Sequence, residues 1–244
     1  MPNKRVVIVV SLIVLVYCLI YYWANDIQIH VIGSGVPGPT ILMIGGTHGN
    51  EPAGSVALNQ LIGQVKVKRG RLIIVPCANK LGLLLNTRWL PHRIWYRDLN
   101  RNYPRISGEI PLEPISQKIS QLALQADFIL DLHEGWGYHR IQPDSMGSGI
   151  YPGDTKLSLE VATKLANHLN KNINADYKKF VVGYNNHPEL NSLRSFCVLH
   201  NRNYILVETT GQNNIQPLDV RVPQHLDVIY ETFRLLKILK IELN

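Results

Sequence analysis

The sequence contains little cysteine, and its three cysteines lie far apart along the chain. Cys18 falls inside an apolar N-terminal segment, so only Cys77 and Cys197 could pair in an oxidising compartment. Two unpaired buried thiols are the commoner arrangement, and the spacing leaves both alternatives open. The low cysteine count excludes a small fold that is held together by a disulfide framework.

The chain also lacks internal repeats, low-complexity tracts and any long linker. Nucleic-acid-binding motifs are absent, and the Lys and Arg residues behind the net charge of +7 are scattered rather than striped. We therefore expect no nucleic-acid partner. A solvated basic surface is favoured over adhesion to an anionic membrane or cell-wall polymer. Hydrophobic residues make up 45% of the chain and charged residues 18%, which predicts a folded domain with a well-filled core.

The N-terminal segment is apolar on every face. Val6 to Trp23 contains no charged residue and would span roughly 27 Å as a helix, close to the hydrocarbon thickness of a bilayer. Lys4 and Arg5 precede this run, and aromatic residues lie at its end, where an interfacial belt would be. The pattern predicts an uncleaved transmembrane anchor whose N-terminus is cytoplasmic.

A cleaved signal peptide and a buried core helix are the alternatives to an anchor. Signal peptides usually have a shorter apolar core and small residues just before the cleavage site. For a cut after Ala24, the bulky Tyr22 would occupy the −3 position. A buried helix is favoured least. We expect residues 1–24 to form a cytoplasmic tip and membrane anchor, and residues 25–244 to form one extracytoplasmic or lumenal domain.

Segments with strand and helix patterns alternate along this domain. Short apolar runs predict strands, and longer runs with apolar residues at helical spacing predict helices. The expected strands are 26–32, 40–44, 71–77, 128–132 and 204–207, and the expected helices are 52–62, 116–126, 158–171, 192–199 and 222–241. The alternation predicts an α/β fold, a three-layer α/β/α sandwich around a mostly parallel mixed sheet.

Polar residues lie at or just beyond the ends of three of these strands, where such sheets bind their ligands. His48 and Glu51 follow the strand 40–44 through a Gly-Gly turn, and His133 ends the strand before it reaches a Gly-rich loop. Together they can bind one zinc ion and leave a position open for water. Each motif alone has a common structural alternative: His48 and Glu51 could be a surface His–Glu pair, and His133 could be a structural histidine.

Glu208 is the candidate general base. An acidic residue at the end of the apolar strand 204–207 is uncommon unless it is paired or functional. Hydrolysis needs a base that takes a proton from the attacking water, and zinc makes that proton easier to remove. A salt bridge to an arginine is the structural alternative.

The segment 78–115 shows few signals of regular structure and carries several arginines, which suggests a functional loop. Guanidinium groups bind carboxylates with two hydrogen bonds and remain charged when partly buried. One arginine can therefore hold a substrate carboxylate while another stabilises the oxyanion at the scissile carbonyl. In isolation, such a loop would be a solvated surface turn.

Together these motifs resemble the zinc metallocarboxypeptidase superfamily, and especially its succinylglutamate desuccinylase/aspartoacylase family, over most of residues 40–212. Residues 45–51 are similar to the first ligand motif of that family, whereas residues 98–104 look more like the peptidase form of the second motif. The resemblance implies one Zn²⁺ per chain, bound by His48, Glu51 and His133. It also implies a hydrolase that cleaves an amide bond next to a free carboxylate.

The resemblance also implies roles for residues outside the ligand set. Carried over by position, these are Glu208 as general base, Arg93 at the oxyanion, Asn100, Arg101 and Arg194 at the substrate carboxylate, and Asp98 as the hydrogen-bond partner that orients His48.

Two departures from the family pattern bear on the substrate. We expect no β-rich C-terminal domain like that of the aspartoacylases over the cleft, and only Tyr184 is a candidate for the capping tyrosine of digestive carboxypeptidases. An open cleft outside the cytoplasm favours peptides, whereas the first motif favours N-acyl amino acids. The hypotheses are therefore a family-like deacylase, an anchored carboxypeptidase that acts on cell-wall or other peptides, and a catalytically silent carboxylate-binding module.

Overall fold

The computed structural model describes residues 3–106, 108–111, 113–183 and 191–238. Within them, seven strands form one mixed sheet in the order β1-β3-β2-β4-β7-β5-β6. The strands are β1 (His30–Gly33), β2 (Thr40–Gly45), β3 (Arg71–Val75), β4 (Phe128–Gly135), β5 (Gly149–Pro152), β6 (Val181–Val182) and β7 (Asn203–Thr210). The four central strands, β3, β2, β4 and β7, are parallel, whereas β1 and β5 run antiparallel to their central neighbours. The predicted α/β class with a mostly parallel mixed sheet is confirmed.

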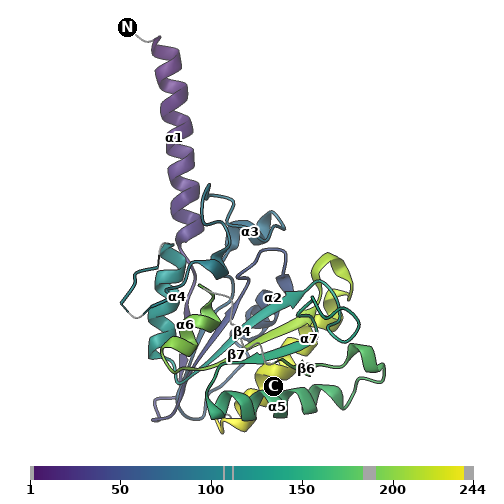
Figure 1. The fold of residues 1–244 in the computed structure, drawn as a ribbon. Helices are drawn as coiled ribbons and strands as arrows, with labels where there is room; N and C mark the ends of the chain where they lie inside the picture. Colours follow the sequence, from purple (N-terminus) through teal and green to yellow (C-terminus); the bar gives the residue numbers. More distant parts are fainter. Residues whose placement is uncertain (1–2, 107, 112, 184–190, 239–244) are drawn as a thin grey trace.

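Helices cover both faces of the sheet (Figure 1). The helices among the described residues are α1 (Lys4–Asn25), α2 (Pro52–Leu61), α3 (Lys80–Leu84), α4 (Pro114–Gln125), α5 (Lys156–Asn170), α6 (Leu193–Leu199) and α7 (Leu218–Leu235), with 3₁₀ turns η1 (Leu99–Arg101), η2 (Asp176–Lys178) and η3 (Gln212–Asn214). Helices α2, α5 and α7 pack on one face, and α4 and α6 pack on the other.

The central strands are buried on both sides because successive side chains point to opposite faces. In β2, Ile41 and Met43 enter the core under α2, α5 and α7, whereas Leu42 and Ile44 enter the core under α4 and α6. All of them are fully buried. β2 is therefore a nearly continuous apolar run, and it ends at the edge of the sheet where the parallel strands have their carboxyl ends.

The expected elements are present with shifted ends, and two strands were not predicted. The first strand begins at His30, because the chain first passes from α1 into the domain. The last helix begins at Leu218 and ends at Leu235, while residues 239–241 of the expected helix lie outside the described residues. These two strands, β5 and β6, are short. β5 forms because it pairs with β7, and no local periodicity in the sequence predicts it.

Cys77 and Cys197 are both free thiols. Cys197 is buried in α6, and Cys77 is partly buried beyond the end of β3. Burial raises the pKa of the Cys77 thiol to about 11. Of the two alternatives left open by the sequence, the structure has the unpaired one.

Helix α1 projects from the domain like a stalk (Figure 1). By length and composition it could cross a membrane, and none of its most apolar window is buried; a signal sequence near the N-terminus has the same properties. Only Ala24 and Asn25 at its end are buried against the domain. The structure thus has one exposed apolar N-terminal helix that could serve as an anchor or as a signal.

Candidate metal centre

The ends of β2, β4 and β7 bring the predicted polar residues together. His133 in β4 pairs in register with Glu208 in β7, so their side chains project from the same side of the sheet. His48 and Glu51 lie in the turn from β2 to α2. Gly46 in this turn has a φ of 61°, a left-handed conformation that favours glycine. Pro52 then opens α2 directly after Glu51.

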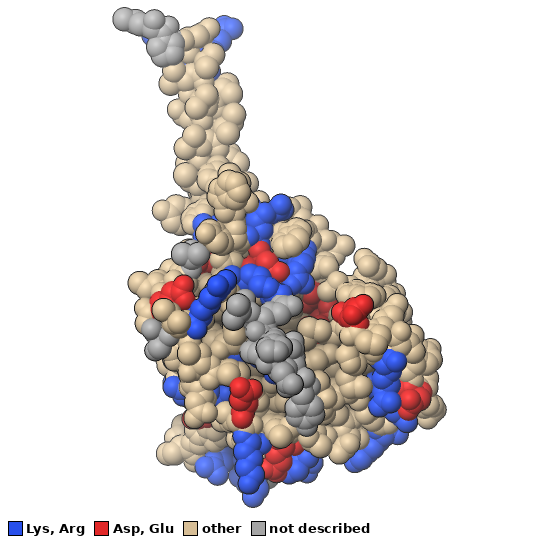
Figure 2. Space-filling model, viewed as in Figure 1, with Lys and Arg blue, Asp and Glu red and all other residues tan. Residues whose placement is uncertain are grey.

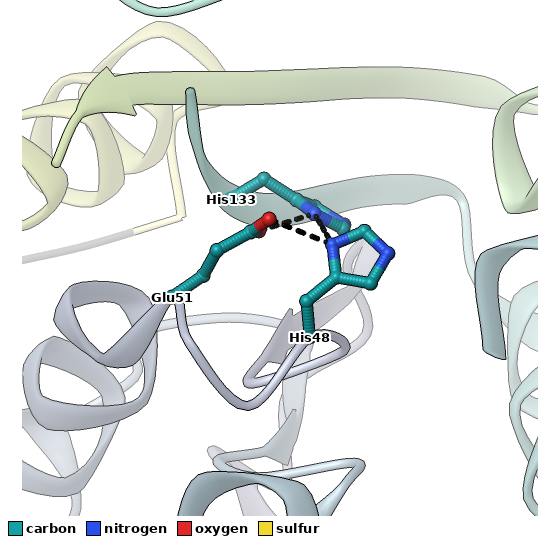
Figure 3. Close-up of side chains that lie close together, drawn as sticks. All are labelled: His48, Glu51 and His133. Atoms are coloured by element: carbon teal, nitrogen blue, oxygen red, sulfur yellow. Dashed lines mark hydrogen bonds and ion pairs between the residues drawn. The ribbon is translucent and has the colours of Figure 1, made fainter. Parts of the chain in front are cut away.

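His48, Glu51 and His133 converge on one point (Figure 3). The Nδ1 atoms of both histidines lie 2.8 Å from a carboxylate oxygen of Glu51 and 3.2 Å from each other. All three side chains are buried, and their candidate ligand atoms lie within 4.8 Å of one another. Two imidazole nitrogens and one carboxylate are the protein ligands of many catalytic zinc sites, so the set fits a zinc ion.

A carboxylate faces the outer nitrogen of each histidine. Nε2 of His48 lies 3.2 Å from Oδ1 of Asp98, and Nε2 of His133 lies 3.1 Å from Oδ1 of Asp131. Tyr204 donates a hydrogen bond of 2.7 Å to the other oxygen of Asp131. Such partners fix the ring orientation of metal-binding histidines. Asp131 was not predicted, although an acid inside an apolar strand two residues before His133 was a usable signal.

The centre attracts positive charge. Burial opposes ionisation of Glu51, but His48 and His133 outweigh it and hold the pKa of this carboxyl far below its ordinary value. Burial also opposes protonation of His133, yet Asp131 and Glu51 outweigh it and raise the pKa of the imidazole well above its ordinary value. The cluster is therefore built to stabilise a buried cation.

A buried ion pair fixes the loop that supports Glu51. Glu51 accepts hydrogen bonds of 3.1 Å from the backbone N–H of Glu134 and 2.9 Å from the side chain of Gln212. The Glu134 carboxylate pairs with Arg221 of α7, which also donates to Asn214 in the same turn as Gln212. No local pattern marks Gln212 or Arg221, because their contacts to Glu51 and Glu134 arise only in the folded chain.

A cavity of about 210 Å³ lies beside the metal centre. Four further predicted residues line it, namely Asn100, Arg101, Arg194 and Glu208, and so do Arg88, Trp136 and Asp144, which were not predicted. Arg93 does not line this cavity. Its guanidinium instead donates a hydrogen bond of 2.9 Å to Glu113 and lies over the ring of Tyr21 at the end of α1.

Glu208 faces this cavity beside His133. Burial and the nearby Glu51 carboxylate raise the pKa of Glu208 to about 8. Among the described residues, no hydrogen bond to its carboxylate is made. A carboxyl group with a pKa near neutrality and a free oxygen can accept and return a proton.

Arg88 occupies the position beside the ligands where Arg93 was expected. Its guanidinium donates hydrogen bonds of 3.0 and 2.8 Å to Asp98. One of its nitrogens lies 3.6 Å from the Glu51 carboxylate. Both arginines belong to a loop without regular structure, so spacing alone could not tell which of them reaches the cavity.

Three elements hold the remaining cavity residues. The side-chain oxygen of Asn100 accepts a hydrogen bond of 2.9 Å from the backbone of Leu193 at the start of α6. Arg194, also in α6, donates a hydrogen bond of 3.0 Å to the carbonyl of Pro152 in β5. Arg101 lies beside Asn100 in η1. These arginine and amide side chains make up a donor-rich wall of the cavity. Tyr184 lies outside the described residues.

We expect acid to destabilise the fold through His225, which is fully buried in α7. Burial first, and then His133 and Arg221, lower its pKa to about 3 from an ordinary 6.5. Above pH 6.5 the imidazole is neutral in both states, and its full contribution is present. As the pH falls towards 3, only the unfolded chain takes up the proton, so stability is lost.

This loss amounts to about 2 kcal/mol between pH 6.5 and pH 5. Urea unfolding at pH 7 and pH 5 measures it for the wild type and for His225→Gln. The variant is expected to lose this part of the pH dependence, and equal pH slopes for the two proteins would contradict the assignment.

Sequence comparison identifies a known family over part of the chain. Residues 37–139 match the family model for the succinylglutamate desuccinylase/aspartoacylase catalytic domain. The N-α-acetyl-L-2,4-diaminobutyric acid deacetylase of Halomonas elongata is 34% identical over 101 residues, which cover 40% of this chain and 29% of that protein. The chain thus matches less than a third of the length of this curated relative.

Solved structures share the fold. Product-bound cell shape determinant protein Csd4 from Helicobacter pylori has a TM-score of 0.76 and 22% identity, over 90% of this chain and 58% of that chain. A succinylglutamate desuccinylase/aspartoacylase from Rhodobacter sphaeroides has a TM-score of 0.64 and 19% identity, over 88% and 60%. The matched segment carries the His-x-x-Glu motif and His133, so this part of the chain is similar to the catalytic domain of the succinylglutamate desuccinylase/aspartoacylase family.

Proposed function

We propose that this protein is a zinc-dependent hydrolase that cleaves an amide bond next to a free carboxylate. One observation carries the proposal: a buried His-Glu-His set, the Glu208 carboxyl group and several arginines surround the same cavity. The match of residues 37–139 to the succinylglutamate desuccinylase/aspartoacylase catalytic domain supports it.

In this proposal His48, Glu51 and His133 hold one Zn²⁺ per chain. Zinc supplies a Lewis acid that polarises a carbonyl and makes water more acidic. Glu208 accepts the proton of the attacking water and delivers it to the leaving nitrogen, which its raised pKa favours. Asp98 and Asp131 hold the two imidazoles in position for this work.

The arginines divide two tasks. Arg88, beside the ligands, stabilises the negative charge that develops on the scissile carbonyl oxygen. Arg101 and Arg194, with the amide of Asn100, bind the substrate carboxylate on the donor-rich wall. The position of Arg93 against Glu113 supports a structural task for it instead.

A pair of matched substitutions separates the two arginines. Arg88→Gln is expected to lower kcat by about 10²–10³-fold, since it removes a donor that acts on the transition state, with little change in KM. Arg93→Gln is expected to change kcat less than about threefold, with a lower unfolding temperature because buried Glu113 loses its partner. If the two effects on kcat were reversed, the oxyanion role would return to Arg93.

Two substrate classes carry the amide bond and free carboxylate that the proposed reaction requires. The family match and the deacetylase relative favour an N-acyl amino acid. An exposed apolar helix that could anchor the domain outside the cytoplasm favours an anchored carboxypeptidase acting on cell-wall or other peptides, and one solved relative is described as a D,L-carboxypeptidase.

Metal analysis of the purified chain, followed by a hydrolysis screen, tests the proposal. The screen sets N-acetyl-L-2,4-diaminobutyrate, N-acetyl-aspartate and N-succinyl-glutamate against peptides with free C-termini and cell-wall peptides. About one zinc per chain is expected, with release from the first group identifying a deacylase and release from the second a carboxypeptidase. Bound metal and bound carboxylates without hydrolysis would identify a binding module. A protein that binds no zinc would overturn the proposal.

We also infer that α1 is an uncleaved anchor that leaves the catalytic domain outside the cytoplasm or in a lumen. The basic residues Lys4 and Arg5 before the helix and its exposed apolar surface support this orientation. Resistance of the full chain to alkaline carbonate extraction and an intact N-terminus by sequencing are expected. A mature N-terminus near residue 25 would instead establish a signal peptide.

A further inference from the structure

Large apolar side chains are exposed on one loop region of the domain. We call this set the loop patch. It consists of Leu84, Leu85, Ile94, Trp95 and Tyr96, which are 59% to 79% exposed. Large apolar side chains that are exposed close together in a domain commonly mark a surface that binds a partner. Two aliphatic residues end α3, and the other three form the tip of the following loop.

The loop patch lies at the foot of α1. Lys80, at the start of α3, lies 4.8 Å from the ring centroid of Trp23 in the last turn of α1. The ring of Tyr21, two residues earlier in α1, packs edge-on against His92 with ring centroids 5.7 Å apart, and Arg93 lies over the same ring. Figure 1 shows α3 and the following loop beside the lower end of the projecting helix.

The loop that presents the patch is fixed from within the domain. The backbone N–H of Leu90 donates a hydrogen bond of 2.7 Å to the carbonyl of Arg97, which closes the loop. Asn102 donates a hydrogen bond of 2.9 Å to the carbonyl of Tyr96, a residue with a left-handed φ of 55°. Since a bulky residue adopts this conformation only when its surroundings impose it, the outward projection of the tip is built into the fold.

Basic groups accompany the apolar ones. Arg97 is exposed and lies over the ring of exposed Trp89 at 5.8 Å, and Lys80 lies over Trp23. Lys and Arg side chains gather on the face just below α1 (Figure 2). Aromatic, aliphatic and basic side chains at one level are the composition of a membrane–water interface, in which phosphate groups meet the ends of acyl chains.

We propose that the loop patch inserts into the interface of the bilayer that α1 spans, with its basic neighbours at the phosphates of anionic headgroups. The proposal rests on the inferred anchor. Because the contacts to Tyr21 and Trp23 hold the loop at the level where α1 leaves the membrane, the lipid surface is the partner that reaches it first. The domain then has two points of membrane contact, a spanning helix and a shallow loop.

Quenching of tryptophan fluorescence by lipids with brominated acyl chains tests the proposal on the full chain. The protein is reconstituted in vesicles of phosphatidylcholine with phosphatidylglycerol, as wild type, as Trp95→Phe and as Trp136→Phe. Trp95 is one of four tryptophans, and Trp136, at the catalytic cavity, is the matched control. We expect Trp95→Phe to lose part of the quenched fraction and Trp136→Phe to show a larger quenched fraction than the wild type.

Failure of this proposal and failure of the anchor give different results. Carbonate extraction of the same vesicles reports the anchor alone. If the protein resists extraction but Trp95→Phe and the wild type are quenched equally, the loop patch is outside the lipid. If acrylamide, a quencher in the aqueous phase, also fails to reach Trp95, the patch is covered by protein. If the protein is extracted, both inferences are wrong.

Discussion

Glu208→Gln is expected to abolish turnover while leaving zinc content and fold intact. Glutamine keeps the size of the side chain but cannot accept the proton, so kcat should fall by about 10²–10⁴-fold. Steady-state kinetics on a substrate from the screen, with metal analysis of the same preparation, measure both quantities. The control is Glu160→Gln on α5, which makes the same chemical change at an exposed position and should leave kcat unchanged.

The pH dependence of the wild type gives a second view of the same residue. Only the ionised carboxylate accepts a proton, and burial with Glu51 raises the pKa of Glu208 to about 8. A cation held by the neighbouring ligands favours the ionised form and lowers this value. We therefore expect kcat/KM to rise with pH along a limb whose midpoint lies at or below about 8. Turnover by Glu208→Gln within tenfold of the wild type would remove Glu208 from the base role.

Glu51→Ala is expected to lose zinc affinity by more than about 100-fold, because even the partners of metal-binding residues contribute about 10–100-fold. The change removes one of three ligands. It also strips the acceptor from Gln212 and from the backbone N–H of Glu134. Competition with a chromogenic chelator measures the affinity, and the catalytic activity should fall with the bound metal.

A graded series makes the result for Glu51 specific. Asp98→Asn keeps all three ligands but weakens the orientation of His48 and the pairing with Arg88, and it is expected to lose about 10–100-fold in zinc affinity. Glu160→Gln should retain wild-type affinity. If Glu51→Ala kept its zinc against the chelator while Asp98→Asn lost it, Glu51 would not belong to the ligand set.

The metal centre was predictable because its residues sit at the ends of strongly patterned strands. His133 and Glu208 end two apolar runs that become neighbours in the sheet, and His48 follows a third through glycines. Parallel strands collect such ends at one edge, so local sequence was enough to place them together.

Other parts of the site depend on tertiary contacts that no local pattern encodes. Arg88 and Arg93 lie in one irregular loop, and packing of that loop against α1 and Glu113 turns one into the cavity and the other away. Gln212 reaches Glu51 because Arg221 holds the turn that carries Gln212, through a hydrogen bond to Asn214 and an ion pair with Glu134. The short strand β5, bounded by glycine and proline, exists because β7 offers it an edge.

No long flexible linker joins α1 to the domain. Only residues 26–29 separate α1 from β1, and Ile27 among them is buried in the domain core. An enzyme anchored in this way cannot swing out to search the surrounding volume. If α1 is the uncleaved anchor that we propose, the cavity stays at one height above the bilayer, and encounters occur by lateral diffusion in two dimensions. Its rate would then follow the surface density of substrates at that height, and those held deeper in a thick polymer layer would remain out of reach.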